Sequence, residues 1–499
     1  MIQLNRIRLG GVLLLISVGF QVSAQTRFDF SDRCKQAYAA ITEFRFDKGQ
    51  ILLNQEKQIN PDNLIPFYLE NYIDFFVLFF NEDPLEYKKR LPNLGKRLDQ
   101  ISQGNKESPF YLFTKSIIHF QWAAIKIKFG NNWDAGWEFR RSFLQVKENK
   151  EKFPSFYPND LYLGSMQVAA GTIPDGYRWL SNMLGIKGTI SQGMKNLDKF
   201  LAQKDEWSQL YRTEAVFYYS YLKFYIENDK KGVIDFIRTQ QLDLRNNHLF
   251  AYLAANLYLN SQQSEKAISI IQNRNESADY FKTPIWDLEL GYAKMNHHEA
   301  DAFTYLDRFV DQFKGRSYVR DALEKISWHY YLQGNQALAD KYRARILQQP
   351  GSDLEADKQA MKEAKSGRWP NKLLLKARLL NDGGYFREAL QLLHGKKSTD
   401  FPEPQDRTEF AYRVGRLYDD LGVDEEAIGF YKQAINAGKE RKEYFAARAA
   451  LHIGNIYEAK GNCTGALGWY QACLNMKDHD FKNSLDQRAK AGIARCKHL

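Results

Sequence analysis

Residues 415–434 read GRLYDDLGVDEEAIGFYKQA, and residues 454–473 read GNIYEAKGNCTGALGWYQAC. In both stretches a glycine is followed by a tyrosine after 3 residues, alanine after 12, an aromatic residue after 16 and a small residue after 19. The positions are Gly415, Tyr418, Ala427, Tyr431 and Ala434, and then Gly454, Tyr457, Ala466, Tyr470 and Cys473. This shared spacing predicts that each stretch folds into the same pair of short helices.

A second glycine marks the turn of each predicted hairpin. Gly422 and Gly461 follow the first glycines by seven residues, and a glycine that ends a helix adopts the left-handed conformation without steric cost. We expect Gly415 and Ala427 to face each other across the hairpin, because helices without bulky side chains at their contact can approach to about 8 Å. Tyr418 and Tyr431 would then fill the wedge between neighbouring hairpins.

Partial copies of the pattern extend through the second half of the chain. Ala377, for example, is followed by Gly384 and Ala389 at matching offsets. The first positions of successive copies are Ala255, Gly291, Ser327, Ala377, Gly415, Gly454 and Gly492. Their spacings are 36, 36, 50, 38, 39 and 38 residues, as in a stack of helical hairpins. The long interval contains residues 351–371, whose helix-forming composition favours an extra polar helix between two blocks of repeats over a long loop.

The pattern resembles that of the tetratricopeptide repeat superfamily over residues 246–499. The resemblance implies an all-α fold, an α-solenoid of helix-turn-helix hairpins, and a role in protein–protein interaction. The first half resembles long exported helical-repeat proteins of Gram-negative bacteria in the wording FRFDKGQILL, PFYLENYIDFF, SPFYLF and TIPDGYRWLSNMLGIKGTISQG. That resemblance implies a location beyond the inner membrane and a scaffold-like role.

Hydrophobic periodicity in the first half is helical, and strand signals are scarce. Candidate helices cover residues 31–44, 47–58, 63–80, 84–103, 108–129, 133–148 and 173–184. The expected organisation is a signal peptide (1–24), an N-terminal helical region (25–204), repeats (205–350), an extra helix or linker (351–370) and C-terminal repeats with a capping helix (371–499). The glycine-rich stretch 171–193 reads as a tight connection between helices, or as a ligand-contacting loop.

The N-terminus has the features of an export signal. Arg6 and Arg8 precede an apolar run over residues 9–20, and small residues at 22–24 favour cleavage before Gln25. We therefore expect a soluble protein that is periplasmic or associated with the cell envelope. The later apolar segment 67–80 contains two carboxylates and fits a buried amphipathic helix better than a membrane span. Removal of the two arginines leaves a formal charge of +8, with no basic block typical of nucleic-acid binding.

Catalytic and metal-binding motifs are not recognisable, so the chain is expected to be non-enzymatic and without a cofactor or metal. The most metal-like cluster, residues 297–299 (His-His-Glu), reads as a solvated turn because adjacent histidines point in different directions on a helix. The four cysteines are Cys34, Cys463, Cys473 and Cys496. They are either small buried residues, or two of the C-terminal three form a disulfide.

The first helices of stacked hairpins build a concave face that usually binds the partner. Counting from the repeat positions places Arg378, Tyr412, Arg416 and Asn455 on this face. The two arginines would hold an acidic side chain or a chain carboxylate, or would pair with Asp382, Asp419 or Asp420. Leucines occupy two positions, 374 and 451, where the known carboxylate-clamp subtype needs lysine.

The sequence leaves a second function open. Aromatic residues make up 14% of the chain, and the tryptophans at 122, 133, 137 and 179 are concentrated in the first half. Because sugars stack on aromatic rings, a carbohydrate- or nutrient-binding protein on the same repeat frame is the alternative to a protein-binding scaffold.

Overall fold

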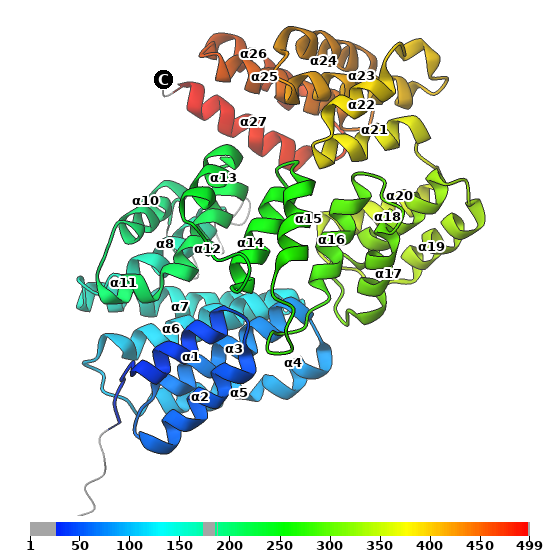
Figure 1. Ribbon diagram of the computed structural model, residues 1–499. Coiled ribbons are helices and arrows are strands. Elements are labelled where there is room, and N and C mark those ends of the chain that lie inside the picture. Colours follow the sequence, from blue (N-terminus) through cyan, green and yellow to red (C-terminus); the bar gives the residue numbers. More distant parts are fainter. Residues whose placement is uncertain (1–25, 173–184, 187, 498–499) are drawn as a thin grey trace, which may run out of the picture.

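The computed structural model describes residues 26–172, 185–186 and 188–497, and it is built from α-helices (Figure 1). The β pairing in these described ranges is confined to an isolated bridge between Arg27 and Asn63. Consecutive helices pack as antiparallel pairs, so the predicted all-α solenoid is confirmed. The predicted signal peptide lies outside the described residues.

Helices make up the N-terminal half, both in the ranges expected from hydrophobic periodicity and beyond them, at residues 158–171 and 190–239. They are α1 (Asp32–Thr42), α2 (Phe46–Ile59), α3 (Ile65–Asn81), α4 (Pro84–Arg90), α5 (Pro92–Ile101), α6 (Pro109–Lys128), α7 (Asn132–Lys152), α8 (Pro158–Gly171), α10 (Ile190–Leu201), α11 (Glu206–Leu210), α12 (Arg212–Tyr225) and α13 (Lys230–Thr239). The single helix predicted over 84–103 was wrong: Pro92 begins a second helix because proline lacks the N–H that would continue the first. The helix predicted over 173–184 lies outside the described residues.

The C-terminal half consists of the predicted hairpins. Their helices are α14 (His248–Leu259), α15 (Ser264–Asn273), α16 (Ile285–Met295), α17 (Ala302–Gln312), α18 (Val319–Leu332), α19 (Gln336–Gln348), α21 (Lys372–Gly383), α22 (Phe386–Leu393), α23 (Pro404–Asp420), α24 (Asp424–Gly438), α25 (Phe445–Ala459), α26 (Cys463–Asn475) and α27 (Lys482–Lys497). A short 3₁₀ turn, η2 (Ser398–Asp400), precedes α23. Each first position of the sequence pattern falls in the first helix of a pair, or in α27. The extra helix is present as α20 (Glu355–Ser366), which ends at Gly367 in the left-handed conformation.

The repeat glycines make room for an aromatic ring. A Cβ atom on Gly415 would lie 2.7 Å from Cδ1 of Tyr431, so the nearest side chain to this glycine is the tyrosine ring. In the next repeat, Cβ atoms on Gly454 and Gly492 would lie 2.5 and 2.4 Å from atoms of the Tyr470 ring. The second-helix tyrosine therefore fills the space between its own hairpin and the following helix. Gly422 and Gly461 have φ of 74° and 73°, as predicted for the turn.

Substitution of Gly415 by leucine is expected to lower the free energy of unfolding by about 1–3 kcal/mol, because the side chain would overlap the buried Tyr431 ring. The control is Gly429→Leu in the same repeat, where a Cβ atom meets nothing within 4 Å. This variant should be neutral or stabilised by up to about 1 kcal/mol, since leucine is the better helix former. Urea denaturation measures both; equal stability of the two variants would contradict the packing role of Gly415.

The solenoid bends until distant repeats touch. The Gln262 side-chain amide, in the α14–α15 turn, donates to the Asn381 carbonyl oxygen and to Asp420 Oδ2, both at 2.9 Å. In the turn between α16 and α17, the ring of His297 stacks on Tyr385 at a centroid distance of 3.9 Å. The His-His-Glu turn therefore packs against the start of α22 and is not simply solvated. Figure 1 shows the result: α21–α27 cross over the ends of α13 and α15. These contacts bring two groups of repeats together, those up to α18 and those from α21 onward.

A buried carboxyl group joins four helices of the N-terminal half. Glu214, on α12, is 4% exposed and accepts hydrogen bonds from Tyr38 on α1 and, at 2.7 Å, from Tyr162 on α8. Tyr72 on α3 shares a hydrogen bond of 2.9 Å with Tyr162, and Tyr68 shares one of 2.8 Å with Tyr72. Burial raises the pKa of Glu214, although the tyrosine hydrogen bonds oppose that shift. This network fixes the packing of α1, α3, α8 and α12.

Candidate functional site

A cavity of about 590 Å³ lies where the two groups of repeats meet, and we name it the central cavity. The first helices of the hairpins, including α12, α14, α16 and α18 on one side and α21, α23 and α25 on the other, supply most of its lining. The polar and aromatic residues that the following paragraphs use are Tyr221, Tyr225, Lys230, Tyr252, Asn256, Glu289, Tyr292, Tyr318, Asp321, Lys325, Asp382, Arg416 and Arg448.

Three positively charged side chains of the lining are near enough to influence one another, and we name them the basic wall: Lys230, Arg416 and Arg448. Arg416 pairs with Asp420 at 3.2 Å and donates to the Tyr412 hydroxyl at 3.4 Å. The Arg448 guanidinium forms no ion pair or side-chain hydrogen bond with the part of the chain that the structure describes, and its Nε is buried. Arg488, which lies with Arg448 along a smaller adjoining pocket, adds another positive charge.

Enclosure by the protein and the neighbouring positive charges both lower the pKa of Lys230. Its side chain is accessible to water in the cavity, yet protein surrounds it on most sides, and its ammonium donates to the Asn260 carbonyl oxygen at 2.8 Å. This enclosure, followed by the positive charges of Arg488, Arg416 and Arg448, lowers its pKa to about 8. An anion bound at the basic wall would relieve the repulsion between these charges.

A second set of lining residues, which we name the tyrosine wall, consists of Tyr221, Tyr225, Tyr252, Tyr318 and a carboxyl group, that of Glu289. Tyr221 and Tyr225 donate to Asn256 Oδ1 at 3.3 and 3.2 Å, and Asn256 Nδ2 donates to Glu289 Oε1 at 2.7 Å. Glu289 is 5% exposed, and its Oε2 has no hydrogen-bond partner among the described residues. Burial raises its pKa to about 7, although the hydrogen bond from Asn256 opposes the shift.

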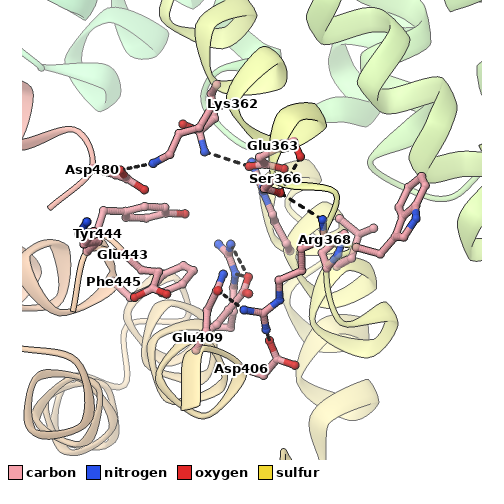
Figure 2. A pocket seen from close by; sticks show the side chains of 18 residues that line it. Lys362, Glu363, Ser366, Arg368, Asp406, Glu409, Glu443, Tyr444, Phe445 and Asp480 are labelled. Atoms are coloured by element: carbon pink, nitrogen blue, oxygen red, sulfur yellow. Dashed lines mark hydrogen bonds and ion pairs between the residues drawn. The ribbon is translucent and has the colours of Figure 1, made fainter. Parts of the chain in front are cut away.

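A second pocket, the C-terminal pocket, has a volume of about 320 Å³ and lies between α20 and the helices α21, α23 and α25 (Figure 2). Its charges are largely neutralised by ion pairs. Lys362 pairs with Asp480, and Arg368 with Asp406 at 3.0 Å; a further pair joins Arg413 to Glu409 at 2.9 Å. Because the central cavity is larger and leaves charged atoms without partners, it is the stronger candidate for a binding site.

Comparison with known proteins supports the assignment of the repeats. Residues 412–443, which begin within α23 and run past α24, match the tetratricopeptide repeat family. This segment is a tetratricopeptide repeat. The resemblance to the tetratricopeptide superfamily inferred from the sequence is confirmed. Tetratricopeptide folds are generally protein–protein interaction scaffolds and typically have no catalytic activity.

Other comparisons add little. The solved structure of the P58(IPK) TPR domain is 15% identical and is matched over 82% of this chain and 95% of its own, with a TM-score of 0.22. At that score the two structures do not superimpose well enough to support any argument about fold or ligand. No curated protein matches this sequence.

The four residues predicted for the concave face of the tetratricopeptide stack do not meet in one site. Arg416 lines the central cavity, whereas Arg378 lines the C-terminal pocket and pairs with Asp382 at 3.8 Å. The Tyr412 ring is buried beside Arg416. Asn455 accepts a hydrogen bond of 3.0 Å from the Tyr470 hydroxyl and lines neither cavity. Both arginines thus have the carboxylate neighbours that the sequence offered as the alternative.

Sequence reasoning missed Glu289 and Arg448. The prediction relied mainly on the residue that follows each repeat position, and Arg416, one of these residues, lines the cavity. Glu289 and Arg448 lie three and seven residues before Tyr292 and Asn455, the residues that follow the positions Gly291 and Gly454. These separations are about one and two helical turns, so the residues share one stripe of the helix. Following the helical period in both directions from each repeat position would have found them.

Several other expectations concern reactive groups. All four cysteines are free thiols, so the C-terminal disulfide considered above is not formed, and Cys34 and Cys473 are fully buried. No group of three or more histidine, cysteine or acidic side chains within the described ranges is arranged to hold a metal ion.

None of the helices described here is both long and apolar enough to cross a membrane.

Proposed function

We propose that this protein is a non-enzymatic interaction protein of the bacterial cell envelope, which holds an acidic segment of a protein partner in its central cavity. The observation that carries the proposal is Arg448: its guanidinium lines the cavity and forms no ion pair or side-chain hydrogen bond in the described part of the chain, although it lies over the Tyr444 ring at 5.6 Å. Carboxylates are suited to this position because a guanidinium can bind them through two parallel hydrogen bonds.

The surroundings of Arg448 favour a segment with more than one negative charge. Lys230 and Arg416 line the same cavity, and Asp420, the only carboxylate paired with Arg416 among the described residues, accepts two further hydrogen bonds, from Gln262 and Asn381. Asp420 therefore compensates one of several positive charges. The uncompensated charge makes recruitment of an anionic partner favourable, most strongly at low ionic strength.

The proposal predicts that Arg448→Glu weakens binding of a fluorescein-labelled tetraglutamate peptide at least about tenfold, because it removes an unpaired cation and adds a repelling charge. Fluorescence anisotropy measures the affinity, with tetraglutamine of the same length as the neutral probe. Arg378→Glu is the matched control: it makes the same charge change in the neighbouring pocket and should change the affinity less than about threefold. Equal binding of the two peptides, or equal effects of the two variants, would refute the acidic-segment proposal.

The envelope location follows from the predicted signal peptide and is tested separately. Mass spectrometry of the protein from fractionated cells should find a chain that begins at Gln25 in the periplasmic or envelope fraction. A chain that retains residues 1–24 in the cytoplasm would contradict this part of the proposal.

Carbohydrate binding remains a second candidate because of one exposed aromatic pair. Trp133 and Trp137, on α7, are 64% and 37% exposed, with ring centroids 6.3 Å apart. Trp122, in contrast, is fully buried, and Trp179 lies outside the described residues. Titration of tryptophan fluorescence with a glycan panel tests this candidate: it requires a change that is lost in Trp133→Ala.

A further inference from the structure

We infer that Glu289 and the tyrosine wall form a binding site for an ammonium group, which makes the central cavity a site for ligands that carry both signs of charge. The inference extends the proposed function. It rests on that function only because it places the ligand in the same cavity. The ammonium could be a lysine side chain or amino terminus of the bound segment, or a free quaternary ammonium compound.

The geometry leaves one carboxylate oxygen for a ligand. Asn256 holds Glu289 by its Oε1, and Asn256 is itself held by the hydroxyls of Tyr221 and Tyr225. Oε2 is buried and has no hydrogen-bond partner in the described ranges, although Glu289 lines the cavity. A buried carboxyl with an unused oxygen destabilises a fold unless it is protonated or meets a cation.

The aromatic groups around this carboxyl suit an ammonium ion. Tyr221 and Tyr225 are stacked at a centroid distance of 5.8 Å, and Tyr252 and Tyr318 complete the tyrosine wall. Burial, and then the charge of Glu289, raise the pKa of Tyr318 to about 12 and also raise the pKa of Tyr225. Faces of tyrosine rings attract organic cations, and aromatic cages bind quaternary ammonium groups in this way.

The protein's own cations do not occupy this position. The charged and titratable groups that line the cavity around Glu289 are Tyr221 and Tyr225 (α12), Lys230 (α13), Tyr252 (α14), Tyr292 (α16), Tyr318, Asp321 and Lys325 (α18 and its N-cap), Asp382 (α21), Arg416 (α23) and Arg448 (α25). Lys325 is engaged by Asp321 at 3.0 Å and Glu324 at 3.2 Å. Tyr292 donates to Asp321 at 2.5 Å. In the described part of the chain no ion pair reaches Glu289, which leaves its charge to a ligand.

The experiment is calorimetric titration of the chain from Gln25 onward with choline and with N-acetyl-lysinamide. The neutral isosteres, 3,3-dimethylbutanol and N-acetyl-norleucinamide, serve as paired probes. Because the ammonium binds the ionised carboxylate and the pKa of Glu289 is about 7, affinity for at least one cation should rise about tenfold between pH 6 and pH 8. Near pH 7 each binding event should release about half a proton, measured in buffers of different ionisation enthalpy.

Glu289→Gln is expected to weaken cation binding at least about tenfold and to abolish the proton release. Asp382→Asn, which neutralises a carboxyl of the same cavity that already pairs with Arg378, should leave both unchanged. Tyr225→Phe keeps the ring and should bind within about twofold of the parent, whereas Tyr225→Leu should bind several-fold more weakly. Since Lys230 also titrates near pH 8, the pH series is repeated in Lys230→Gln, where the rise should persist.

Preference for N-acetyl-lysinamide would identify a peptide lysine as the source, and preference for choline a free quaternary ammonium compound; either supports the site. Equal binding of a cation and its neutral isostere, affinity that falls as pH rises, or an unaffected Glu289→Gln variant would overturn it. Binding of tetraglutamate without any ammonium binding would overturn this inference and leave the proposed function standing. Binding of choline without any peptide binding would overturn the proposed function and leave this inference standing.

Discussion

Replacing Glu214 by alanine is expected to lower the free energy of unfolding by about 3–5 kcal/mol. The substitution leaves the hydroxyls of Tyr38 and Tyr162 without their acceptor, and each buried, unsatisfied donor costs about 1–3 kcal/mol. It also removes side-chain volume beside an apolar cavity of about 130 Å³ that Glu214 lines together with phenylalanines of α3, α6 and α12. Both effects act at the contact of four helices, so the N-terminal half should lose stability as a unit.

Two further variants separate these causes in urea denaturation followed by circular dichroism. Glu214→Gln retains the volume and one acceptor oxygen, and should lose about 1–2 kcal/mol. Glu227→Ala removes a carboxylate just beyond the same helix, where it is paired with Lys223 at the surface, and should change stability by less than about 0.5 kcal/mol. A loss for Glu214→Ala no larger than that for Glu227→Ala would show that the tyrosine network does not stabilise the fold.

Replacing Glu289 by glutamine is expected to stabilise the protein at alkaline pH, by about 3 kcal/mol near pH 8. Folding raises the pKa of this carboxyl from 4.5 to about 7, mainly through burial. Each pKa unit corresponds to about 1.4 kcal/mol, and the structure offers Oε2 no hydrogen bond within the described residues. Glutamine keeps an oxygen for Asn256 and carries no charge to bury.

The direction of the pH dependence follows from the raised pKa. Between pH 4.5 and pH 7 the folded protein binds more protons at Glu289 than the unfolded chain does, so stability is lost as pH rises through this window. Near pH 4 the carboxyl is neutral in both states, and wild type and Glu289→Gln should be equally stable. Urea denaturation across this range tests the prediction. A difference that is independent of pH, or a variant less stable near pH 8, would show that Glu289 is paired or solvated in the folded protein.

A carboxyl that costs the fold stability near neutral pH, in a cavity lined by tyrosines, is the signature expected of a binding site. The two carboxyls differ in this respect. Glu214 uses both oxygens inside the protein, whereas Glu289 leaves one unused among the described residues. Glu214 is therefore assigned a structural role and Glu289 a role in ligand binding.

The sequence predicted the hairpins because their determinants are local. Gly415 and Tyr431, or Gly454 and Tyr470, contact each other within one repeat, so the contact appears in the sequence as a fixed spacing. The turn glycines and the extra helix α20 were predicted for the same reason: backbone conformation and helix propensity depend on neighbouring residues. The break between α4 and α5 could have been predicted from Pro92. The prediction of one helix over 84–103 followed the helical periodicity instead.

The central cavity depends on contacts that no local pattern records. Gln262 and Asp420, which join the two groups of repeats, are 158 residues apart, and they meet because a small rotation at each hairpin accumulates along the stack. The same accumulated rotation brings Arg416 into the cavity and directs Arg378 into another pocket. In the sequence Glu289 and Arg448 look like ordinary charges of amphipathic helices. The amino-acid sequence thus determined the repeated helix pair, and only the tertiary structure decided which charges are enclosed without a partner.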